Sequence, residues 1–500
     1  MTETASEPDS GTPSPGRRQK IVRGGLIMTL VSVIQRSSSF VGQLFLGTIL
    51  FEEDYALFAI ALGLTSIGAA LRSVLQPVLI NQLENQPDAF KTTYRTVLTS
   101  LWGLTIAGVV ASSLLETVLS APGLQPLLIL LLLTMPFQLL AGFGTARISH
   151  GLRFGQVGAA MSAVAIARNI ATVLFALGGL GAISFALGGA ISVAVELLLL
   201  SRYTSLTVSP GLLSKQTLLD VKHSLTSKSR TETRRWIWPS ALAVALANNG
   251  DYTVASLWAS KQIVGLYYFA FTLTGAFWVL LNSAVSTVLV PGFVALKSLD
   301  ERRVRLMETL SISSVVSVLF FNSIAVVMAP MIHSLWDGKW DGAIPAVLVF
   351  SVFAPLQFIH PVVQAIARGT AHWSLYFTDI ALTAVLTLLA AGIGAATGGL
   401  GTIAVLVVGV DVFVSYVSLV RLCRALQTSA FDAIRAATMP WLLGLTSLIG
   451  AHLLHPLDDP DISGSIQRLP VFAALLIVMV ALPYRNSVSG MVRSILGQNS

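Results

Sequence analysis

The sequence contains little charge and a single cysteine. Only 11% of its 500 residues are Asp, Glu, Lys or Arg, against about a quarter in soluble domains, whereas 54% are hydrophobic. With so few charges, most of the surface must contact membrane lipid and not water. This composition therefore excludes an ordinary soluble enzyme. Cys423 cannot form an intramolecular disulfide, and there is no CxxC motif or Cys/His cluster for a metal. The sequence also lacks a GxxxxGK(S/T) motif and any evident catalytic Ser, His or paired carboxylates, so we expect no cofactor and no enzymatic activity.

Apolar segments follow one another almost to the C-terminus. A bilayer core is crossed by about 20 helical residues, and the first apolar segment is too long for a signal-peptide core and has no small-residue cleavage site. We therefore predict an all-α polytopic membrane protein with about fourteen transmembrane helices. The predicted windows are residues 24–50, 55–80, 95–117, 124–146, 157–177, 181–202, 236–258, 263–292, 309–332, 343–366, 374–395, 399–420, 437–455 and 469–484.

The chain also repeats itself. Gly178-Gly179-Leu180-Gly181 returns as Gly398-Gly399-Leu400-Gly401, and each copy opens an apolar helix that ends at a basic residue. We therefore predict two six-helix bundles in parallel pseudo-repeat, followed by two further helices. The predicted organisation is a disordered cytoplasmic tail (1–20), an N-terminal lobe (21–205), a basic cytoplasmic linker (206–235), a C-terminal lobe (236–422), two additional helices (437–484) and a cytoplasmic tail (485–500).

Basic residues fall almost entirely on one predicted side of the membrane. With the N-terminus inside, the cytoplasmic segments hold 25 of the 31 Lys and Arg, the opposite side holds 3, and the helix interiors hold 3. Cytoplasmic loops of membrane proteins carry the excess of Lys and Arg. The net charge of +7 therefore reflects topology and not nucleic-acid binding. We expect a multi-pass protein of the inner (cytoplasmic) membrane with both termini cytoplasmic.

Polar side chains within the predicted helices are the candidate functional residues. A charge at membrane depth costs about 2.5 to 3.5 kcal/mol on insertion scales, so such residues normally face an interior or a watery cavity. The N-terminal half has three arginines at this depth, and Glu196 is the only acid in its helix interiors. The C-terminal half instead has Asp251, Asp379 and Asp411. The candidate substrate-binding residues are Arg36, Gln43, Arg72, Gln76, Arg168, Asn248, Asp251 and Asn282.

Structural roles compete with binding roles at these positions. Arg36 and Arg72 lie on polar stripes of the first two predicted helices, but they could also form structural pairs with Glu196 or Asp251. Three charged residues lie nearer helix ends, where snorkelling to the interface or a structural bond explains them equally well. These are Arg168, Asp379 and Asp411.

Prolines interrupt the predicted helix at 343–366. His360 lies between Pro355 and Pro361, and Gln357 and Gln364 are its polar neighbours. We expect His360 to belong to a kinked, packed helix and not to carry protons, because proline bends a helix and removes a backbone donor.

Several short motifs occur in a fixed order over residues 21–425. They are Asp54-Tyr55-Ala56-Leu57-Phe58-Ala59, Arg153-Phe154, Asp251 with Val264-Gly265-Leu266-Tyr267, Pro291, and Trp336-Asp337-Gly338-Lys339-Trp340. In this order and spacing they resemble the Wzx-type polysaccharide/O-antigen flippases of the multidrug/oligosaccharidyl-lipid/polysaccharide exporter superfamily. The resemblance implies two six-helix bundles around a central cavity that opens alternately to the two sides of the membrane.

The resemblance also implies a substrate, a polyprenyl-(pyro)phosphate-linked oligosaccharide moved from the cytoplasmic to the outer leaflet for cell-surface polysaccharide synthesis. The residues fit it independently, because arginine offers permanent charge and planar donors suited to phosphate oxygens. We therefore expect Arg36 and Arg72 to bind the phosphate, with Asp251 opposite them when the cavity is empty. The polar stripes would accommodate sugar hydroxyls while the prenyl chain stays among membrane lipids. The expected protein partners are glycosyltransferases and a polysaccharide polymerase, with no nucleic acid.

Three other functions stay open from the sequence. A cation-coupled multidrug exporter of the same superfamily would need an acidic N-terminal cavity, and the arginines count against it. A lipid II-type peptidoglycan precursor flippase would share the cationic cavity and the helix number. A non-transporting membrane scaffold for glycosyltransferases would tolerate neutralisation of the buried arginines.

Overall fold

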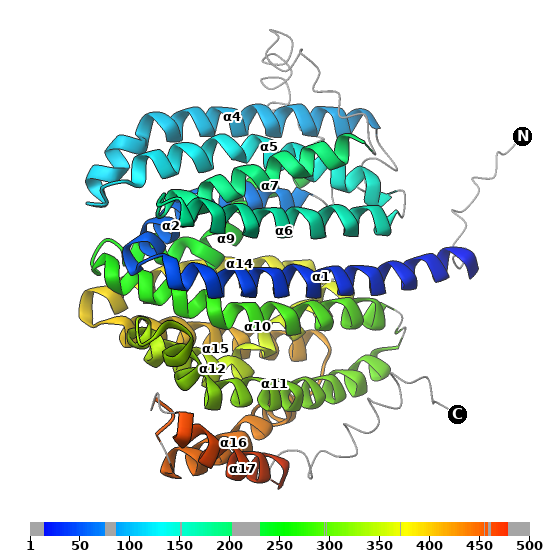
Figure 1. The fold of residues 1–500 in the computed structure, drawn as a ribbon. Helices are drawn as coiled ribbons and strands as arrows, with labels where there is room; N and C mark the ends of the chain where they lie inside the picture. The colour runs from blue at the N-terminus through cyan, green and yellow to red at the C-terminus, as the bar shows by residue number, and fades with distance from the viewer. Residues whose placement is uncertain are drawn as a thin grey trace, which may run out of the picture.

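The computed structural model describes residues 15–75, 87–150, 153–202, 231–294, 296, 298–370, 372–454, 456–458 and 462–478, and their regular structure is helical (Figure 1). The first helix begins at Pro15, so residues 15–20 of the predicted disordered tail are helical instead. The rest of that tail, the C-terminal tail, most of the basic linker and Gln76 lie outside the described residues.

The N-terminal lobe contains six of the predicted membrane windows. Its helices are α1 (Pro15–Ile49), α2 (Glu52–Thr65), α4 (Pro87–Val118), α5 (Leu124–His150), α6 (Phe154–Leu177) and α7 (Ile183–Ser201). A second segment, Ile67–Leu75, continues α2 after a bend of 46°. Glu52, Glu53 and Asp54 occupy the first turn of α2, where acidic side chains complement the positive end of the helix dipole.

The C-terminal lobe repeats this pattern with one helix broken. Its helices are α9 (Thr231–Ala255), α10 (Lys261–Val294), α11 (Leu299–Trp336), the short η3 (Asp341–Ala343), α12 (Ile344–Gln357), α13 (Ile359–Gly369), α14 (Trp373–Thr397) and α15 (Leu400–Ala425). Two more helices, α16 (Ala430–Leu454) and α17 (Ile462–Leu476), pack on the outside of α11. The prolines around His360 flank a one-residue break between α12 and α13 at Phe358, whereas a kink there stays a prediction.

Each predicted window coincides at least in part with a helix. Among the described residues, ten helices are long and apolar enough to cross a membrane, or eleven if the two parts of α2 count as one span. The all-α polytopic fold is therefore confirmed, whereas the count of fourteen stays a prediction. Polar side chains along α1 and charged ones along α9 lower the mean hydropathy of these two helices.

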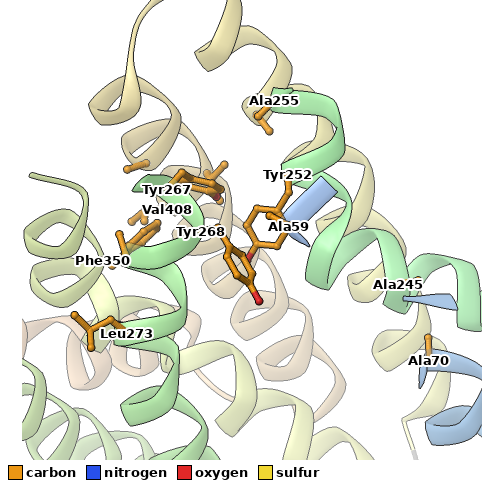
Figure 2. Packing of buried hydrophobic residues seen from close by; sticks show 14 of the residues in the cluster. Ala59, Ala70, Ala245, Tyr252, Ala255, Tyr267, Tyr268, Leu273, Phe350 and Val408 are labelled. Carbon is orange, nitrogen blue, oxygen red and sulfur yellow. The ribbon is translucent and has the colours of Figure 1, made fainter. Parts of the chain in front are cut away.

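The two lobes meet along α1 and α2 on one side and α9 and α10 on the other (Figure 1). Small residues line the contact of α2 and its continuation with α9, where Ala59 lies beside Tyr252 and Ala70 lies beside Ala245 (Figure 2). The Ser66 hydroxyl donates a hydrogen bond to the Ala245 carbonyl at 3.4 Å. Small side chains allow transmembrane helices to approach closely, so α2 is held deep in the molecule.

The repeated glycine motif forms two different turns. Gly179 and Gly181, between α6 and α7, have φ of +79° and +49°. Gly398 and Gly399, between α14 and α15, have φ of −153° and −103°. The repeat therefore fixes where the chain turns, but only the first copy uses the left-handed conformations that favour glycine.

Candidate functional site

Two of the three predicted arginines lie on the α1–α6 pair. Arg36 is half-buried on α1, and Arg168 is exposed within the membrane-spanning part of α6. The Asn169 side-chain amide donates a hydrogen bond to the Ser38 hydroxyl at 2.8 Å, which fixes α6 against α1. Arg168 therefore belongs to the interior of the span and not to a helix end.

Arg168 faces the opposite lobe. The charge of its guanidinium acts on the Tyr268 hydroxyl of α10. Phe40 of α1 also contacts Phe277 of α10, with ring centroids 5.7 Å apart. The helices α1, α6 and α10 thus border one space between the lobes. Within the part of the chain that the structure describes, neither Arg36 nor Arg168 forms an ion pair.

The third arginine, Arg72, is paired with a carboxylate of its own lobe. Its guanidinium forms a bidentate ion pair with Glu196 of α7, in which the Nη1–Oε2 distance is 2.9 Å. Nη2 also donates a hydrogen bond to the Thr145 hydroxyl of α5 at 3.4 Å. The aliphatic part of the Arg72 side chain crosses α5 at Gly142. A Cβ atom on residue 142 would collide with it. Arg72 therefore joins α2, α5 and α7, which is the structural alternative that the sequence left open.

Asp251 does not face the arginines, contrary to the sequence-based expectation. It is buried on α9, and its Oδ2 accepts a hydrogen bond from the Tyr267 hydroxyl at 2.8 Å. Its Oδ1 has no hydrogen-bond partner among the described residues. The physical reason is that α10 folds back beside α9 and brings a closer donor than any arginine.

The remaining predicted residues divide between the lobes. Gln43 is buried on α1, and its Nε2 has no hydrogen-bond partner within the described residues. Gln76 lies outside the described residues. Asn248 and Asn282 line a cavity inside the C-terminal lobe together with Asp251.

This C-terminal cavity has a volume of about 480 Å³ and is lined by residues of α9 to α15. Both polar and aromatic side chains line it, among them Trp278, Asp411 and Tyr376. The Gln357 side-chain amide donates a hydrogen bond to Asp411 Oδ2 at 3.0 Å. A volume of this size is in the range of ligand-binding pockets. Within the described residues, no three His, Cys, Asp or Glu side chains are grouped to hold a metal ion.

A buried polar network supports one end of the cavity. Gln364 Nε2 contacts Asp379 Oδ2 at 3.1 Å and the His360 ring at 3.0 Å. Asp379 is paired with Arg421 of α15 at 2.5 Å. Arg421 also donates a hydrogen bond to the Thr378 hydroxyl at 2.6 Å. The network ties α13, α14 and α15 together, so Asp379 makes a structural bond.

The two lobes are closed against each other at the end that the sequence places outside the cell. The Lys339 ammonium donates hydrogen bonds to the carbonyls of Gly47, Thr48 and Leu50, at 3.2, 3.2 and 2.7 Å. Trp340 Nε1 donates to the Gly47 carbonyl at 2.9 Å. The last carbonyls of a helix lack partners, and a cation there is favoured. Lys339 and Trp340 therefore cap α1 from the other lobe.

Aromatic rings fill the space beneath this cap. Trp340 stacks on Phe269 of α10 with ring centroids 3.9 Å apart, and Tyr55 of α2 packs against Trp340 edge to face. Gly265 brings the α10 backbone directly against the Glu52 carbonyl, where no side chain would fit. We call these residues, with Lys339, the outer closure. It excludes passage between the lobes at that end.

Sequence reasoning missed most side chains of the C-terminal cavity, among them Trp278, Arg368, Tyr376 and Thr387. Arg368 lies over the Tyr376 ring at 5.7 Å from its centroid. The spacing of Gln357, His360 and Gln364 on one helical face was the available signal, because a polar face inside a predicted membrane helix indicates an internal cavity.

Comparison with known proteins agrees with this architecture. The sequence pattern of a family described as polysaccharide biosynthesis protein matches residues 45–345. No curated protein sequence matches the chain. The structure is similar to the lipid II flippase MurJ in an inward closed conformation, with 12% identity, a TM-score of 0.70, and coverage of 93% of this chain and 100% of that chain. It is also similar to an inward-facing multidrug resistance MATE family transporter of the MOP superfamily, with 15% identity, a TM-score of 0.61, and coverage of 81% and 98%. At these identities the likeness establishes a shared fold.

Proposed function

The chain belongs to the polysaccharide biosynthesis protein family, and from that premise we propose that it is a flippase that moves a polyprenyl-(pyro)phosphate-linked oligosaccharide from the cytoplasmic to the outer leaflet. It is a multi-pass membrane protein with a transporter fold.

One observation carries the proposal. Arg36 and Arg168 lie between the lobes at membrane depth with no ion-pair partner among the described residues, whereas Arg72 is neutralised by Glu196. A charge at membrane depth without a partner is costly, so two such cations favour an anionic ligand. Guanidinium groups donate planar, charge-assisted hydrogen bonds that match phosphate oxygens. Arg168 thus takes the phosphate-binding role that the sequence assigned to Arg72.

The same geometry would also place the sugar and the prenyl chain of the substrate. The Ser38 hydroxyl accepts a hydrogen bond from Asn169, the neighbour of Arg168, and with the Tyr268 hydroxyl it would contact a sugar or phosphate, while the prenyl chain stays in lipid. The outer closure blocks the lobes at one end, so the substrate would enter from the cytoplasmic side. Transport then requires the outer closure to open and the cytoplasmic side to close, which is alternating access.

Neutralising the two free arginines tests the phosphate-binding role. We expect Arg36→Gln and Arg168→Gln each to reduce flipping at least tenfold, because a hydrogen bond to a charged group contributes about 1.5 to 3 kcal/mol. Lysine at either position should rescue only in part, since it lacks the planar fork. The measurement is accumulation of lipid-linked oligosaccharide on the cytoplasmic leaflet, at matched amounts of folded protein.

Arg305→Gln is the control, because Arg305 is an exposed arginine at the cytoplasmic end of α11. Unchanged flipping by both neutral variants would refute the phosphate-binding role and favour the scaffold. Accumulation of a peptidoglycan precursor would instead favour lipid II transport, and loss of drug extrusion would favour a multidrug exporter.

The direction of transport depends on the topology, which cysteine labelling tests. In a Cys423→Ala background, an impermeant thiol reagent should label Asp459→Cys in intact cells and leave Ser227→Cys unlabelled. The positive-inside distribution of Lys and Arg motivates this expectation. The reverse labelling pattern would overturn the proposed orientation.

A further inference from the structure

The C-terminal cavity contains buried oxygen atoms that nothing in the described protein satisfies. Asp251 Oδ1, Gln364 Oε1 and Thr387 Oγ1 have no hydrogen-bond partner there, and all three residues line the cavity and are more than nine-tenths buried. A buried acceptor without a partner costs about 1 to 3 kcal/mol. Three of them in one cavity indicate a ligand that donates several hydrogen bonds.

These oxygens are spread along the cavity and do not share one centre. Gly250 lies against Leu388, which places their neighbours Asp251 and Thr387 at the same level of the bundle. Gln364 is hydrogen-bonded to Asp379, which lies eight residues before Thr387 on α14. Eight helical residues correspond to about 12 Å. A cation such as Ca²⁺ holds its ligands within about 2.3 to 2.6 Å, so one ion cannot engage both levels.

Aromatic side chains form the apolar walls between these levels. Trp278 of α10 lies at the cavity with its ring 5.5 Å from that of Phe358, and Tyr376 lies at the end near Arg368. Aromatic faces carry partial negative charge and favour C–H groups that carry partial positive charge. A sugar ring presents such C–H groups on its faces and hydroxyl donors around its edge. An elongated, hydroxyl-rich ligand therefore matches both kinds of wall.

The charges of the cavity restrict the class of sugar. Asp251 and Asp411 are two carboxylates in the lining, whereas Arg368 is the one Lys or Arg among the described lining residues. A carboxylate on a ligand would be repelled by the carboxylates of Asp251 and Asp411. This repulsion is stronger in a partly enclosed site, because water screens the charges less there. Uronic or other acidic sugars would meet this repulsion, and neutral sugars would not.

The C-terminal cavity adjoins the space between the lobes across α10. Phe277 contacts α1, whereas its neighbour Trp278 lines the C-terminal cavity, so α10 forms the wall between the two spaces. Asn248 of α9 lines the same cavity with an exposed side chain.

From this geometry we propose that the C-terminal cavity binds a short neutral segment of the oligosaccharide, separately from the phosphate that Arg36 and Arg168 hold between the lobes. The assignment rests on the proposed function and makes the cavity its sugar-selective site. Asp251, Thr387 and Gln364 accept hydrogen bonds from sugar hydroxyls, and Trp278 contacts a ring face.

Binding of free sugars to the purified full-length protein tests this assignment without lipid or phosphate. The probes are neutral di- and trisaccharides of hexoses, deoxyhexoses and N-acetylhexosamines, with a uronic-acid disaccharide for comparison, measured by isothermal titration calorimetry. We expect at least one neutral probe to bind and the acidic one to bind at least tenfold more weakly. Thr387→Val should weaken binding about fivefold, the effect of one neutral hydrogen bond.

Matched variants separate binding from folding. Thr387→Ser should restore binding, because it keeps the hydroxyl. Thr99→Val is the control for Thr387→Val, since the Thr99 hydroxyl of α4 also lacks a partner within the described residues but lies outside the cavity. Trp278→Leu should abolish binding, and Trp102→Leu on α4 should not. Equal losses from the cavity and control variants would overturn the assignment.

The remaining outcomes distinguish this assignment from the proposed function. If the wild type binds none of the neutral probes but still flips a lipid-linked oligosaccharide, the sugar site is wrong and the flippase stands. Sodium binding that Thr387→Val removes, without sugar binding, would identify a cation site instead. Specific sugar binding in a protein that flips no lipid-linked sugar would support the cavity assignment and refute the proposed function.

Discussion

The two lobes share a helical plan but differ in how completely two of their charged residues, Arg72 and Asp251, are partnered. In the N-terminal lobe, Arg72 is satisfied by Glu196 and Thr145, and the lobe has no comparable set of unpartnered oxygens at one cavity among its described residues. In the C-terminal lobe, a carboxylate, Asp251, lines a cavity with one oxygen unpartnered. A polar residue buried with its partner holds a bundle together, whereas one buried without a partner prepares the bundle for a ligand.

The strongest test of this comparison is to remove the acid of the N-terminal pair. We expect Glu196→Gln to destabilise the protein by about 3 to 5 kcal/mol, because it leaves the Arg72 charge buried without a partner. The Arg72 and Glu196 side chains are only 23% and 9% exposed, so water cannot replace the carboxylate. Thermal unfolding of the purified protein, followed by fluorescence-detected size exclusion, measures the loss.

A second change should reverse much of that loss. The double variant Arg72→Met and Glu196→Gln has no buried charge, so we expect folded protein to return. Glu308→Gln is the control, because its pair with Arg305 is about half exposed and surface pairs contribute about 0 to 1 kcal/mol. Wild-type stability in Glu196→Gln would show that the pair does not hold the lobe together.

The equivalent experiment in the C-terminal lobe should have a smaller effect. Asp379→Asn breaks the pair with Arg421, but the Arg421 side chain is 35% exposed and water can solvate its charge. We expect a loss of about 1 to 2 kcal/mol, the usual cost of weakening a hydrogen bond to a charged group. The same unfolding assay measures it. A loss equal to that of Glu196→Gln would contradict the difference between the lobes.

The outer closure, where the lobes meet, offers a conformational test. Lys339→Met removes the donor for three carbonyls of α1, so we expect the closed arrangement to weaken by about tenfold in population. In a Cys423→Ala background, the buried Leu50 changed to cysteine should then react faster with an impermeant thiol reagent. Lys261→Met is the control, as another basic residue on the same predicted side. Unchanged reactivity would show that Lys339 does not hold the closure.

The smallest expected effect compares the two glycine turns. Gly179 has φ of +79°, so Gly179→Ala should cost about 1 to 2 kcal/mol. Gly399 has φ of −103° and no atom near the position of a Cβ, so Gly399→Ala should change stability by less than about 0.5 kcal/mol. Thermal unfolding of both variants measures the difference. Equal losses of stability in the two variants would mean that the two copies of the glycine motif share a backbone conformation as well as a position in the fold.

Much of the fold could be predicted because it depends on local pattern. The apolar window at 157–177 lies within α6, and the two prolines around His360 mark the break between α12 and α13. These features follow from helix length in a bilayer and from the missing proline donor. The beginning of α1 at Pro15 was missed, because a polar, basic segment has no apolar pattern to indicate a helix.

Partners within the candidate site could not be predicted to the same degree. The polar stripe placed Arg72 in an interior, but the choice between Glu196 and Asp251 depends on how the helices pack. Gly142 opens the path of Arg72 toward Glu196, and Tyr267 reaches Asp251 first. Helical periodicity gives the face of a side chain, whereas its partner is set by tertiary contacts.

The position of the outer closure on α10 has a mechanical consequence. The 34-residue helix is held near one end, where Gly265 contacts Glu52 and Phe269 stacks on Trp340. From Phe269 to Val294 the helix extends about 38 Å. A tilt of roughly 10° about the held end would move the other end by about 6 to 7 Å. The wall between the C-terminal cavity and the space between the lobes is thus a lever whose fulcrum is the outer closure, and a small rotation there would widen or narrow the space between the lobes at the opposite end.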